Sequence, residues 1–206
     1  MIFEQFSRIG IIPIAAIDDP KNAAPLAKVL SENGLPCVEI AFRTPAAEES
    51  VRIISREFPD VLVGAGTVLT TENADRAMNA GAKFIVSPGL NPKVVQHCID
   101  NSVPVIPGAM TPSEMEQALE LGLEVVSFFP AEQAGGLAMI KAVSEVFTDL
   151  KFMPSGGLNA KNVRNYLACD KIIVACAGNW MIVNDLITTG KLVKEAASIV
   201  KEIRRC

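Results

Sequence analysis

The chain has 206 residues, of which 50% are hydrophobic and only 5% aromatic, and its formal net charge is −4. A chain of this length can bury most of its apolar surface around one core, so we expect a single domain over residues 1–206. The acidic charge balance provides no basic surface for binding nucleic acid. The scarcity of aromatic residues favours a core of Val, Ile, Leu and Ala, which is typical of parallel strands covered by helices.

Eight short β-rich runs recur along the chain, with helical segments between them. In chain order they are Ile11–Ile17, Cys37–Phe42, Leu62–Ala65, Phe84–Ser87, Val103–Ile106, Val125–Phe129, Phe152–Met153 and Ile172–Cys176. This alternation predicts a parallel α/β protein. Eight such units in one domain favour a (β/α)8 TIM barrel, and a doubly wound open sheet is the alternative.

Capping residues mark where several of the intervening helices should begin. Thr44-Pro45 and Thr111-Pro112 each place a capping side chain before a proline at the first helical position. Asn159, which follows two glycines, can cap another helix.

The cysteines and the start of the chain favour a cytoplasmic protein. The first eight residues lack the basic segment, the apolar run and the cleavage site of a secretory signal. No charge-free and glycine-free apolar stretch reaches about 18 residues, so we expect no membrane span. Five cysteines are widely spread without the paired spacing of zinc sites, and His97 is the only histidine. We therefore predict a reduced protein with no metal site.

In a barrel of this kind, reactive groups belong at the carboxyl ends of the strands. The second run ends in Val38–Thr44, which places Glu39 inside an apolar segment and Arg43 just beyond it. Burial would raise the pKa of Glu39 toward that of a general base, while Arg43 offers a bidentate fork for a carboxylate. The alternative is an internal ion pair between Glu39 and Arg43 that only fixes the loop.

Other strand ends carry weaker signals. Thr67 supplies a hydroxyl after a glycine-rich turn, and Pro88 would shape a wall, although structural turns would look the same. The run Pro154–Asn159 joins a strand end to an expected helix start, which aims free backbone N–H groups at an anion. The eighth strand ends in Ala177–Trp180, and two small-residue loops at these positions predict one phosphate cup.

The nine residues Glu124–Glu132, Glu-Val-Val-Ser-Phe-Phe-Pro-Ala-Glu, resemble the catalytic strand of a bacterial enzyme family. The family is that of the class I aldolases that cleave 2-keto-3-deoxy-6-phosphogluconate (KDPG) and 2-keto-4-hydroxyglutarate (KHG). Its motif reads Lys-Phe-Phe-Pro-Ala-Glu, and the lysine forms an imine with the ketone of the substrate. Ser127 stands at that position here. The runs 63–69, 85–90 and 130–136 also agree with the family nearly residue for residue.

The resemblance implies a role for each residue that matches the family's pocket. Glu39 matches the general acid/base, and Ser127 holds the place of the lysine. The substrate-binding positions are Arg43 for the carboxylate, Thr67 and Pro88 around the pyruvyl group, and Phe129 as an aromatic wall. The phosphate-binding positions are Gly156, Gly157 and Asn179, where Asn179 replaces a serine that is common in the family.

The family's cycle releases pyruvate and either glyceraldehyde 3-phosphate or glyoxylate, and it needs the protonated imine as an electron sink. Ser127 can add at most a neutral hemiketal. Lys83 and Lys151 lie at the amino ends of their expected strands, and Lys141 lies in the helix expected after the sixth strand, so none of them is expected to substitute. A metal-dependent mechanism needs several carboxylate or imidazole ligands, and Glu39 and Glu132 alone are too few.

Three functional hypotheses follow from these patterns. The first is an aldolase-family protein for reversible retro-aldol cleavage of small keto acids or keto-sugar-acid phosphates, without a cofactor and, by resemblance, as a homotrimer. The second is a catalytically inactive homologue that binds keto acids or sugar phosphates. The third is another phosphate-binding barrel enzyme, such as an isomerase or synthase, for which the pairing of Glu39 and Arg43 has no obvious use.

Overall fold

The computed structural model describes residues 2–204, in which strands and helices alternate. The strands are β1 (Ile11–Ala15), β2 (Cys37–Ala41), β3 (Leu62–Gly66), β4 (Ile85–Ser87), β5 (Val105–Pro107), β6 (Val125–Phe128), β7 (Lys151–Pro154) and β8 (Cys176–Gly178). The helices are α1 (Ile2–Ile9), α2 (Ala23–Glu32) after the short 3-10 turn η1 (Pro20–Asn22), α3 (Ala47–Glu57), α4 (Thr71–Asn79), α5 (Pro92–Asp100), α6 (Pro112–Glu120), α7 (Gly136–Ser144), α8 (Val163–Leu167) and α9 (Leu186–Arg204). Each strand overlaps one of the predicted runs.

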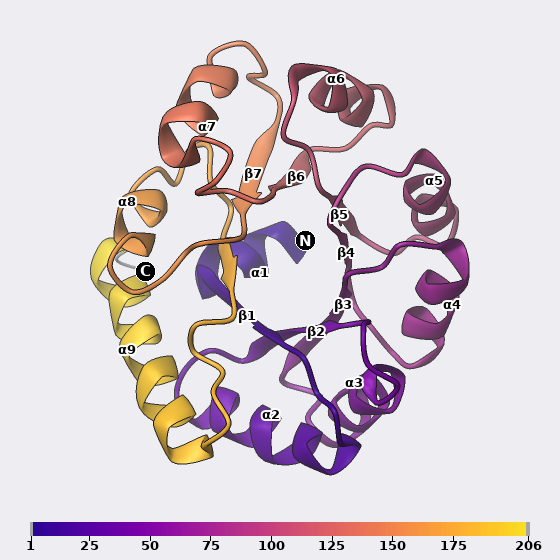
Figure 1. Cartoon of the computed structure of the whole chain (residues 1–206), viewed down its shortest axis with the longest axis vertical. Coiled ribbons are helices and arrows are strands. Elements are labelled where there is room, and N and C mark those ends of the chain that lie inside the picture. Colours follow the sequence, from indigo (N-terminus) through magenta and orange to yellow (C-terminus); the bar gives the residue numbers. More distant parts are fainter. Residues whose placement is uncertain (1, 205–206) are drawn as a thin grey trace.

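The strand pairs within residues 2–204 are all parallel, which confirms the expected parallel α/β fold. One sheet has the order β5-β4-β3-β2-β1-β8, and a second sheet pairs β6 with β7. Isolated parallel bridges join Gly108 after β5 to Ser127 in β6, and Ser155 after β7 to Ala177 in β8. Figure 1 shows the strands around a central axis, with α2 to α9 outside them. A doubly wound open sheet, which carries helices on both faces, lacks this arrangement.

The eighth strand begins later than the apolar run Ile172–Cys176 suggests. Ile173 makes only an isolated bridge to β7, and regular pairing with β1 starts at Cys176, opposite Ile11. Because β1 begins at Ile11, it has no residue to pair with the start of the run. The carbonyls of Ile173 and Val174 instead accept hydrogen bonds of 2.8 and 2.6 Å from the guanidinium of Arg204.

The predicted helix caps have mixed outcomes. Thr111 caps α6 as expected, because its hydroxyl accepts from the amide of Glu114 while the Glu114 carboxylate accepts from the amide of Thr111. The prediction for Thr44 is wrong, since α3 begins only at Ala47. The Thr44 hydroxyl donates instead to the carbonyl of Ile17, at 2.5 Å. That acceptor is 27 residues away in the sequence, so no local pattern reveals it.

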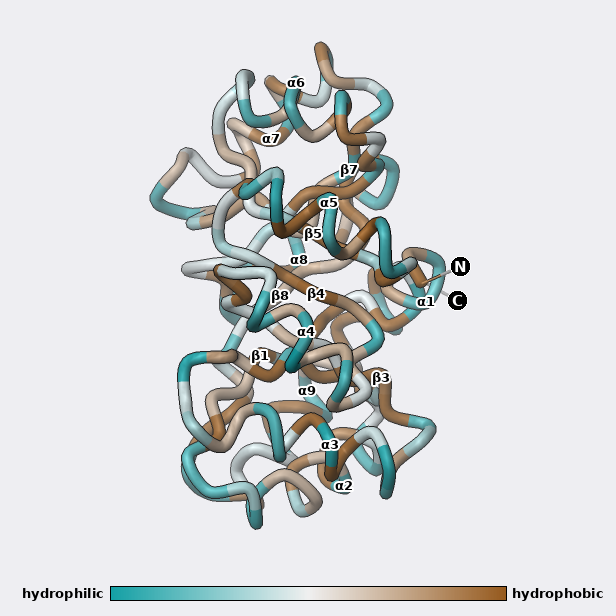
Figure 2. The backbone as a smooth tube through the Cα atoms, turned by 90° about the vertical axis from the view of Figure 1, so that its right-hand side faces the viewer, coloured by the Kyte–Doolittle hydropathy of each residue, from teal (hydrophilic) through white to brown (hydrophobic). Residues whose placement is uncertain are grey.

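Two hydrophobic clusters fill the fold, and successive strand residues alternate between them. In β6, Val125 belongs to a small cluster inside the ring of strands, while Val126 belongs to the larger cluster between strands and outer helices. Helix α1 covers the amino end of the ring, where Phe6 packs edge-to-face on Phe84 with ring centroids 4.9 Å apart. Figure 2 shows hydrophobic residues along β4 and β5 and more hydrophilic residues along the helices outside them.

Cys37, Cys98, Cys169 and Cys176 are free thiols, and Cys206 lies outside the described residues. Between residues 2 and 204, no helix combines the length and the apolar character needed to cross a membrane.

Candidate active site

A cavity of about 240 Å³ opens at the carboxyl ends of the strands, at the opposite end of the ring from α1. The two-residue period of a strand explains how its walls arise: Glu39 follows Cys37 and Ser127 follows Val125, each two positions above a residue of the inner cluster. The structure brings together all the residues that the sequence predicts for the site, namely Glu39, Arg43, Thr67, Pro88, Ser127, Phe129, Gly156, Gly157 and Asn179. Their roles remain predictions.

Glu39 is the buried acid of the cavity, and its side chain is only 5% exposed. Its Oε2 atom has no hydrogen-bond partner among the described residues. Burial raises the pKa of this carboxyl to about 7, because the charged form loses its hydration. Gly66 makes room for the carboxyl, since a Cβ at that position would lie 1.8 Å from Glu39 Oε1. The backbone of β3 therefore leaves space for a carboxyl that forms no salt bridge within residues 2–204.

Arg43 lies at the mouth of the same cavity. In the part of the chain that the structure describes, its guanidinium takes part in no salt bridge, so the alternative of an internal Glu39 to Arg43 ion pair is wrong. The side chain is exposed and follows directly from β2. An unpaired guanidinium at a cavity mouth offers two parallel N–H donors to a ligand carboxylate.

Three serines line the cavity, and the sequence reasoning singled out only Ser127. Ser87, Ser127 and Ser155 are at most 8% exposed. The hydroxyl of Ser87 donates to the carbonyl of Gly89 at 2.9 Å. Ser155 lies two residues beyond Met153, which belongs to the inner cluster, so the period of β7 could have identified it as inward-facing. The glycines that follow Ser155 predict a role only for the backbone amides of that loop.

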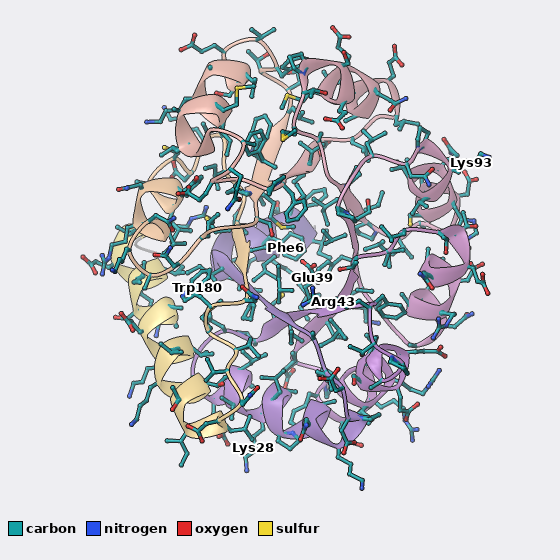
Figure 3. All side chains as sticks on the ribbon, in the orientation of Figure 1. Phe6, Lys28, Glu39, Arg43, Lys93 and Trp180 are labelled. Atoms are coloured by element: carbon teal, nitrogen blue, oxygen red, sulfur yellow. The ribbon has the colours of Figure 1, made fainter. Side chains whose placement is uncertain are left out.

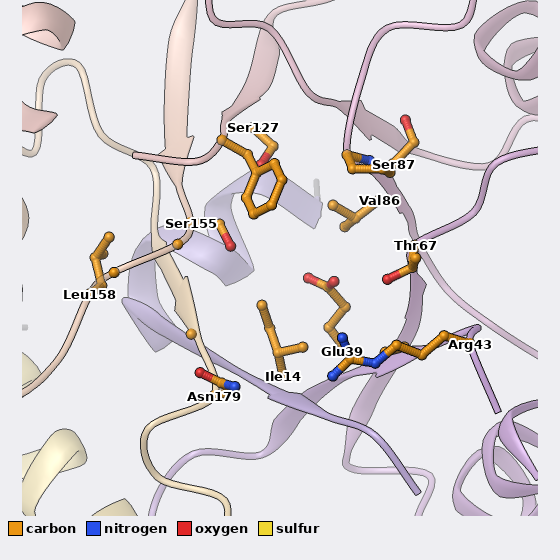
Figure 4. Close-up of a pocket in the computed structure, with 16 residues that line it drawn as sticks. Ile14, Glu39, Arg43, Thr67, Val86, Ser87, Ser127, Ser155, Leu158 and Asn179 are labelled. Carbon is orange, nitrogen blue, oxygen red and sulfur yellow. The ribbon is translucent and has the colours of Figure 1, made fainter. Parts of the chain in front are cut away.

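Thr67 adopts an uncommon backbone conformation, with φ 58°. A β-branched residue in the left-handed region costs of order 1–3 kcal/mol and is held there by its surroundings. In Figure 4 the hydroxyl of Thr67 points into the cavity, beside the carboxyl of Glu39. Such strain at a cavity wall is typical of a functional position.

Gly156 and Gly157 form a loop whose carbonyls are engaged and whose amides are free. The carbonyl of Gly156 accepts from the Glu132 amide, and that of Gly157 accepts from the side chains of Asn159 and Asn162. Within residues 2–204 no protein acceptor takes a hydrogen bond from either glycine amide. Both glycines have positive φ, 94° and 79°, and successive amides in this kind of turn form an anion-binding concavity.

The prediction that Asn159 caps a helix directly after this loop is wrong. Helix α8 begins at Val163 and has five residues, while the side chain of Asn159 accepts from the amide of Lys161 in a local turn. The start of α8 is therefore not part of this loop, and the glycine amides are the donors that the loop itself offers to an anion.

The lysines lie away from the cavity. Among the described residues that line it, none is a lysine. Lys83 and Lys151 are exposed near the amino ends of β4 and β7, and Lys141 is exposed on α7. Figure 3 likewise shows Lys28 and Lys93 at the periphery while Glu39 lies near the centre. In residues 2–204 there is also no cluster of three or more His, Cys, Asp or Glu side chains suited to a metal ion.

A second cavity of about 520 Å³ adjoins the first and shares Ile14, Arg43 and Asn179 with it. Its other walls come from the loop after β1 and from the residues between β8 and α9, including Ile17 and Ile182. Arg43 and Asn179 therefore border both cavities.

Comparisons with known proteins show which family the chain is similar to. A family model described as KDPG and KHG aldolase matches residues 2–197. The chain is 46% identical over 189 residues to a 2-dehydro-3-deoxy-phosphogluconate aldolase of Treponema pallidum, covering 92% of this chain and 90% of the relative. It is 43% identical over 206 residues to the enzyme of the same description from Haemophilus influenzae, covering 97% of each.

Solved structures are similar as well. The KDPG aldolase of Zymomonas mobilis with 3-phosphoglycerate has a TM-score of 0.90 at 33% identity, covering 96% of this chain and 95% of that one. The KDPG aldolase of Legionella pneumophila, with pyruvate captured as a covalent carbinolamine, has a TM-score of 0.85 at 34% identity, with the same coverage.

Proposed function

Because this chain belongs to the KDPG and KHG aldolase family, we propose that its cavity binds a small keto acid or keto-sugar-acid phosphate in the manner of a retro-aldol enzyme. The ligands are KDPG or 4-hydroxy-2-oxoglutarate, and cleavage would give pyruvate with glyceraldehyde 3-phosphate or glyoxylate. The observation that carries the proposal is that three groups without a partner among residues 2–204 line one cavity, namely the Glu39 carboxyl, the Arg43 guanidinium and the amides of Gly156 and Gly157.

Each of these groups suits a different part of the ligand. Arg43 would hold the carboxylate through a bidentate pair. Glu39 would move protons at the reacting carbon, because a carboxyl with a pKa of about 7 is suited to both directions of transfer. The pyruvyl group would lie against Thr67 and Pro88, with Phe129 as a wall. The glycine amides and Asn179 would bind the phosphate.

In this proposal no imine forms with the ketone of the substrate, because Ser127 stands where the family has its lysine. The carbinolamine of the Legionella relative is an adduct that requires an amine, whereas a serine hydroxyl can give only a neutral hemiketal. We therefore expect turnover far below that of a lysine-bearing aldolase. The second candidate function, an inactive protein that binds keto acids or sugar phosphates, is favoured by the same serine.

We also propose that residues 1–206 form a single closed (β/α)8 barrel. The isolated bridges on both sides of the β6-β7 pair support closure of the two sheets into one ring. By family resemblance we propose a cytoplasmic homotrimer. Size-exclusion chromatography with light scattering would then give a mass near three times the 22.0 kDa of one chain.

Calorimetric titration with pyruvate and with KDPG tests the proposed ligand class. We expect both to bind, and we expect Arg43→Ala to weaken binding by roughly 10- to 100-fold, as for the loss of a charge-assisted pair. Arg56→Ala is the matched control, because Arg56 is exposed on α3 and lies outside the cavity. Failure of the wild-type protein to bind either ligand would overturn the proposal.

Borohydride reduction in the presence of pyruvate, followed by peptide mass spectrometry, tests the chemistry separately. We expect no pyruvyl adduct on any lysine. A trapped adduct would contradict the conclusion that Ser127 ends imine formation.

A further inference from the structure

A carboxyl and two hydroxyls lie across the cavity from one another, and the protein itself leaves them unpaired. Glu39 comes from β2, whereas Ser127 and Ser155 come from the carboxyl ends of β6 and β7. In residues 2–204, no hydrogen bond engages the side chain of Glu39, Ser127 or Ser155. Figure 4 shows the carboxyl of Glu39 and the hydroxyl of Ser155 directed into the space between them. A small ligand in this space meets a proton acceptor on one side and hydroxyl donors on the other.

Strand pairing places the two serines on adjacent strands, where Ser127 pairs with Met153 and Ser155 lies two residues beyond Met153. Phe128 pairs with Pro154 in the register of β6 and β7, and the amide of Ser155 donates to the carbonyl of Phe128 at 3.0 Å. Ser127 is further held by its own carbonyl, which accepts from the amide of Ala109 at 2.9 Å. Both side chains are almost completely buried, at 2% and 8% exposure. The two hydroxyls therefore line the cavity with little exposure to bulk solvent.

We propose that this cavity enolises 2-keto acids directly, without an imine, using Glu39 as the base and the hydroxyls of Ser127 and Ser155 as donors to the ketone oxygen. The inference rests on the proposed function only in that a 2-keto acid binds here. It adds a reaction that the lost lysine does not prevent.

The proposed step moves one proton and two electron pairs. The Glu39 carboxylate takes a proton from C3 of the keto acid, and the C3–H bonding pair becomes the second bond between C2 and C3. The former C2–O π pair moves onto the ketone oxygen, which accepts hydrogen bonds from Ser127 and Ser155. The protonated Glu39 carboxyl then exchanges its proton with solvent, and return of a solvent-derived proton from Glu39 to C3 restores the ketone. The net result is exchange of C3 hydrogen with solvent, and no oxidant or further reactant is needed.

The surroundings of the base favour this step. Gly66 leaves space for the carboxyl in its present position, since a Cβ there would overlap Oε1. Burial raises the pKa of Glu39 to about 7, which makes it a stronger base than an exposed carboxylate and leaves much of it ionised near neutral pH. Donors that are already oriented toward the developing oxyanion stabilise it without reorganisation.

Proton NMR of pyruvate in D2O buffer measures the exchange as loss of the methyl signal. We expect the wild-type protein to accelerate this loss over buffer, with a rate that rises with pH and levels off above about 7. Glu39→Gln should lower the protein-dependent rate on the order of 100-fold or more, as for loss of a general base. Ser127→Ala and Ser155→Ala should each lower it by about tenfold or more. Glu145→Gln, an exposed change outside the cavity, should leave it unchanged.

Binding measured on the same samples separates the two proposals. If pyruvate binds in an Arg43-dependent way and the wild-type protein does not accelerate exchange, the inference is wrong and the proposed ligand class stands. If pyruvate does not bind, the inference is wrong, and if KDPG does not bind either, the proposed ligand class is wrong as well. Exchange that survives Glu39→Gln, or that accompanies a borohydride-trapped lysine adduct, also overturns the inference. Should Glu39→Gln fail to fold, Glu39→Asp must lower the exchange rate while pyruvate binding is retained.

Discussion

Gly64 and Gly66, two residues apart on β3, leave space for very different neighbours. A Cβ at Gly64 would lie 2.4 Å from the ring of Phe84, whereas a Cβ at Gly66 would lie 1.8 Å from the Glu39 carboxyl. Phe84 belongs to the filled apolar cluster beside α1, and Glu39 lies in the cavity with an unpaired oxygen. A step of two residues along β3 thus separates the apolar cluster around Phe84, which stabilises the fold, from the polar cavity around Glu39 at the carboxyl ends of the strands.

The largest effect on stability is expected at the apolar end. Phe84→Ala removes a fully buried ring that packs on Phe6, so it should lower the free energy of unfolding by about 3–5 kcal/mol. Denaturant titration measures this loss. Leu69→Ala, at a side chain that is 55% exposed, is the control and should change stability far less. Equal losses in the two variants would contradict the assignment of the inner cluster as the stabilising end.

Glu39→Gln should stabilise the protein, by an amount that grows with pH. The pKa of Glu39 is about 7 in the folded state against an ordinary value of 4.5, so the folded chain binds more protons between these pH values. The wild-type protein therefore loses stability as pH rises through this window, by at most about 1.4 kcal/mol per pH unit, and the loss is complete above pH 7. Glutamine does not ionise and avoids this loss. Denaturant titrations of both proteins at pH 5 and pH 8 should show a gain for the variant that is about 2–3 kcal/mol larger at pH 8. An equal difference at both pH values would contradict the burial of an unpaired carboxyl.

Adding the same methyl group at the two glycines compares the two regions directly. Gly64→Ala should cost about 1–3 kcal/mol, because the Phe84 ring is enclosed and cannot retreat. Gly66→Ala should cost less stability, since the Glu39 carboxyl can swing into the cavity, but it should weaken pyruvate binding. Denaturant titration and calorimetry measure the two effects. If Gly64→Ala weakened pyruvate binding and Gly66→Ala did not, the assignment of Gly66 to the ligand cavity and of Gly64 to the apolar core would be contradicted.

The smallest effect is expected at Gly89, where a Cβ would meet nothing within 4 Å. Gly89→Ala should change the free energy of unfolding by no more than about 0.5 kcal/mol. It is the matched control for the other two alanine variants, and a large loss there would show that added methyl groups act through the backbone rather than through their neighbours.

Local patterns predict the strands better than their ends. The apolar run around Ile173 indicates an eighth strand, but where it starts depends on β1, which first offers a partner at Ile11. The sequence around Thr44 predicts that its hydroxyl makes a hydrogen bond to the backbone of a following helix. The hydroxyl does bond to a backbone group, but that group is the carbonyl of Ile17, which is distant in the sequence. Both misses come from contacts between distant segments.

The candidate site was largely visible in the sequence because parallel strands bring their carboxyl ends together. Glu39, Arg43 and Ser127 meet at one cavity for that reason. Less visible were Ser87 and Ser155, whose inward orientation follows from the pleat of each strand rather than from a motif. The fit of Glu39 against Gly66 depends on the register of β2 with β3, which pairs Glu39 with Gly64 and Ala41 with Gly66.

If the residues around Ser127 have the roles that we propose, the pocket should gain aldolase activity when an amine is supplied at that position. The direct measurement is pyruvate release from KDPG by the wild-type protein and by Ser127→Lys, in an assay coupled to pyruvate reduction. We predict a gain on the order of 100-fold or more in Ser127→Lys, lost again when Glu39→Gln is added. A folded Ser127→Lys protein that binds pyruvate but cleaves KDPG no faster than the wild type would contradict this view of the pocket.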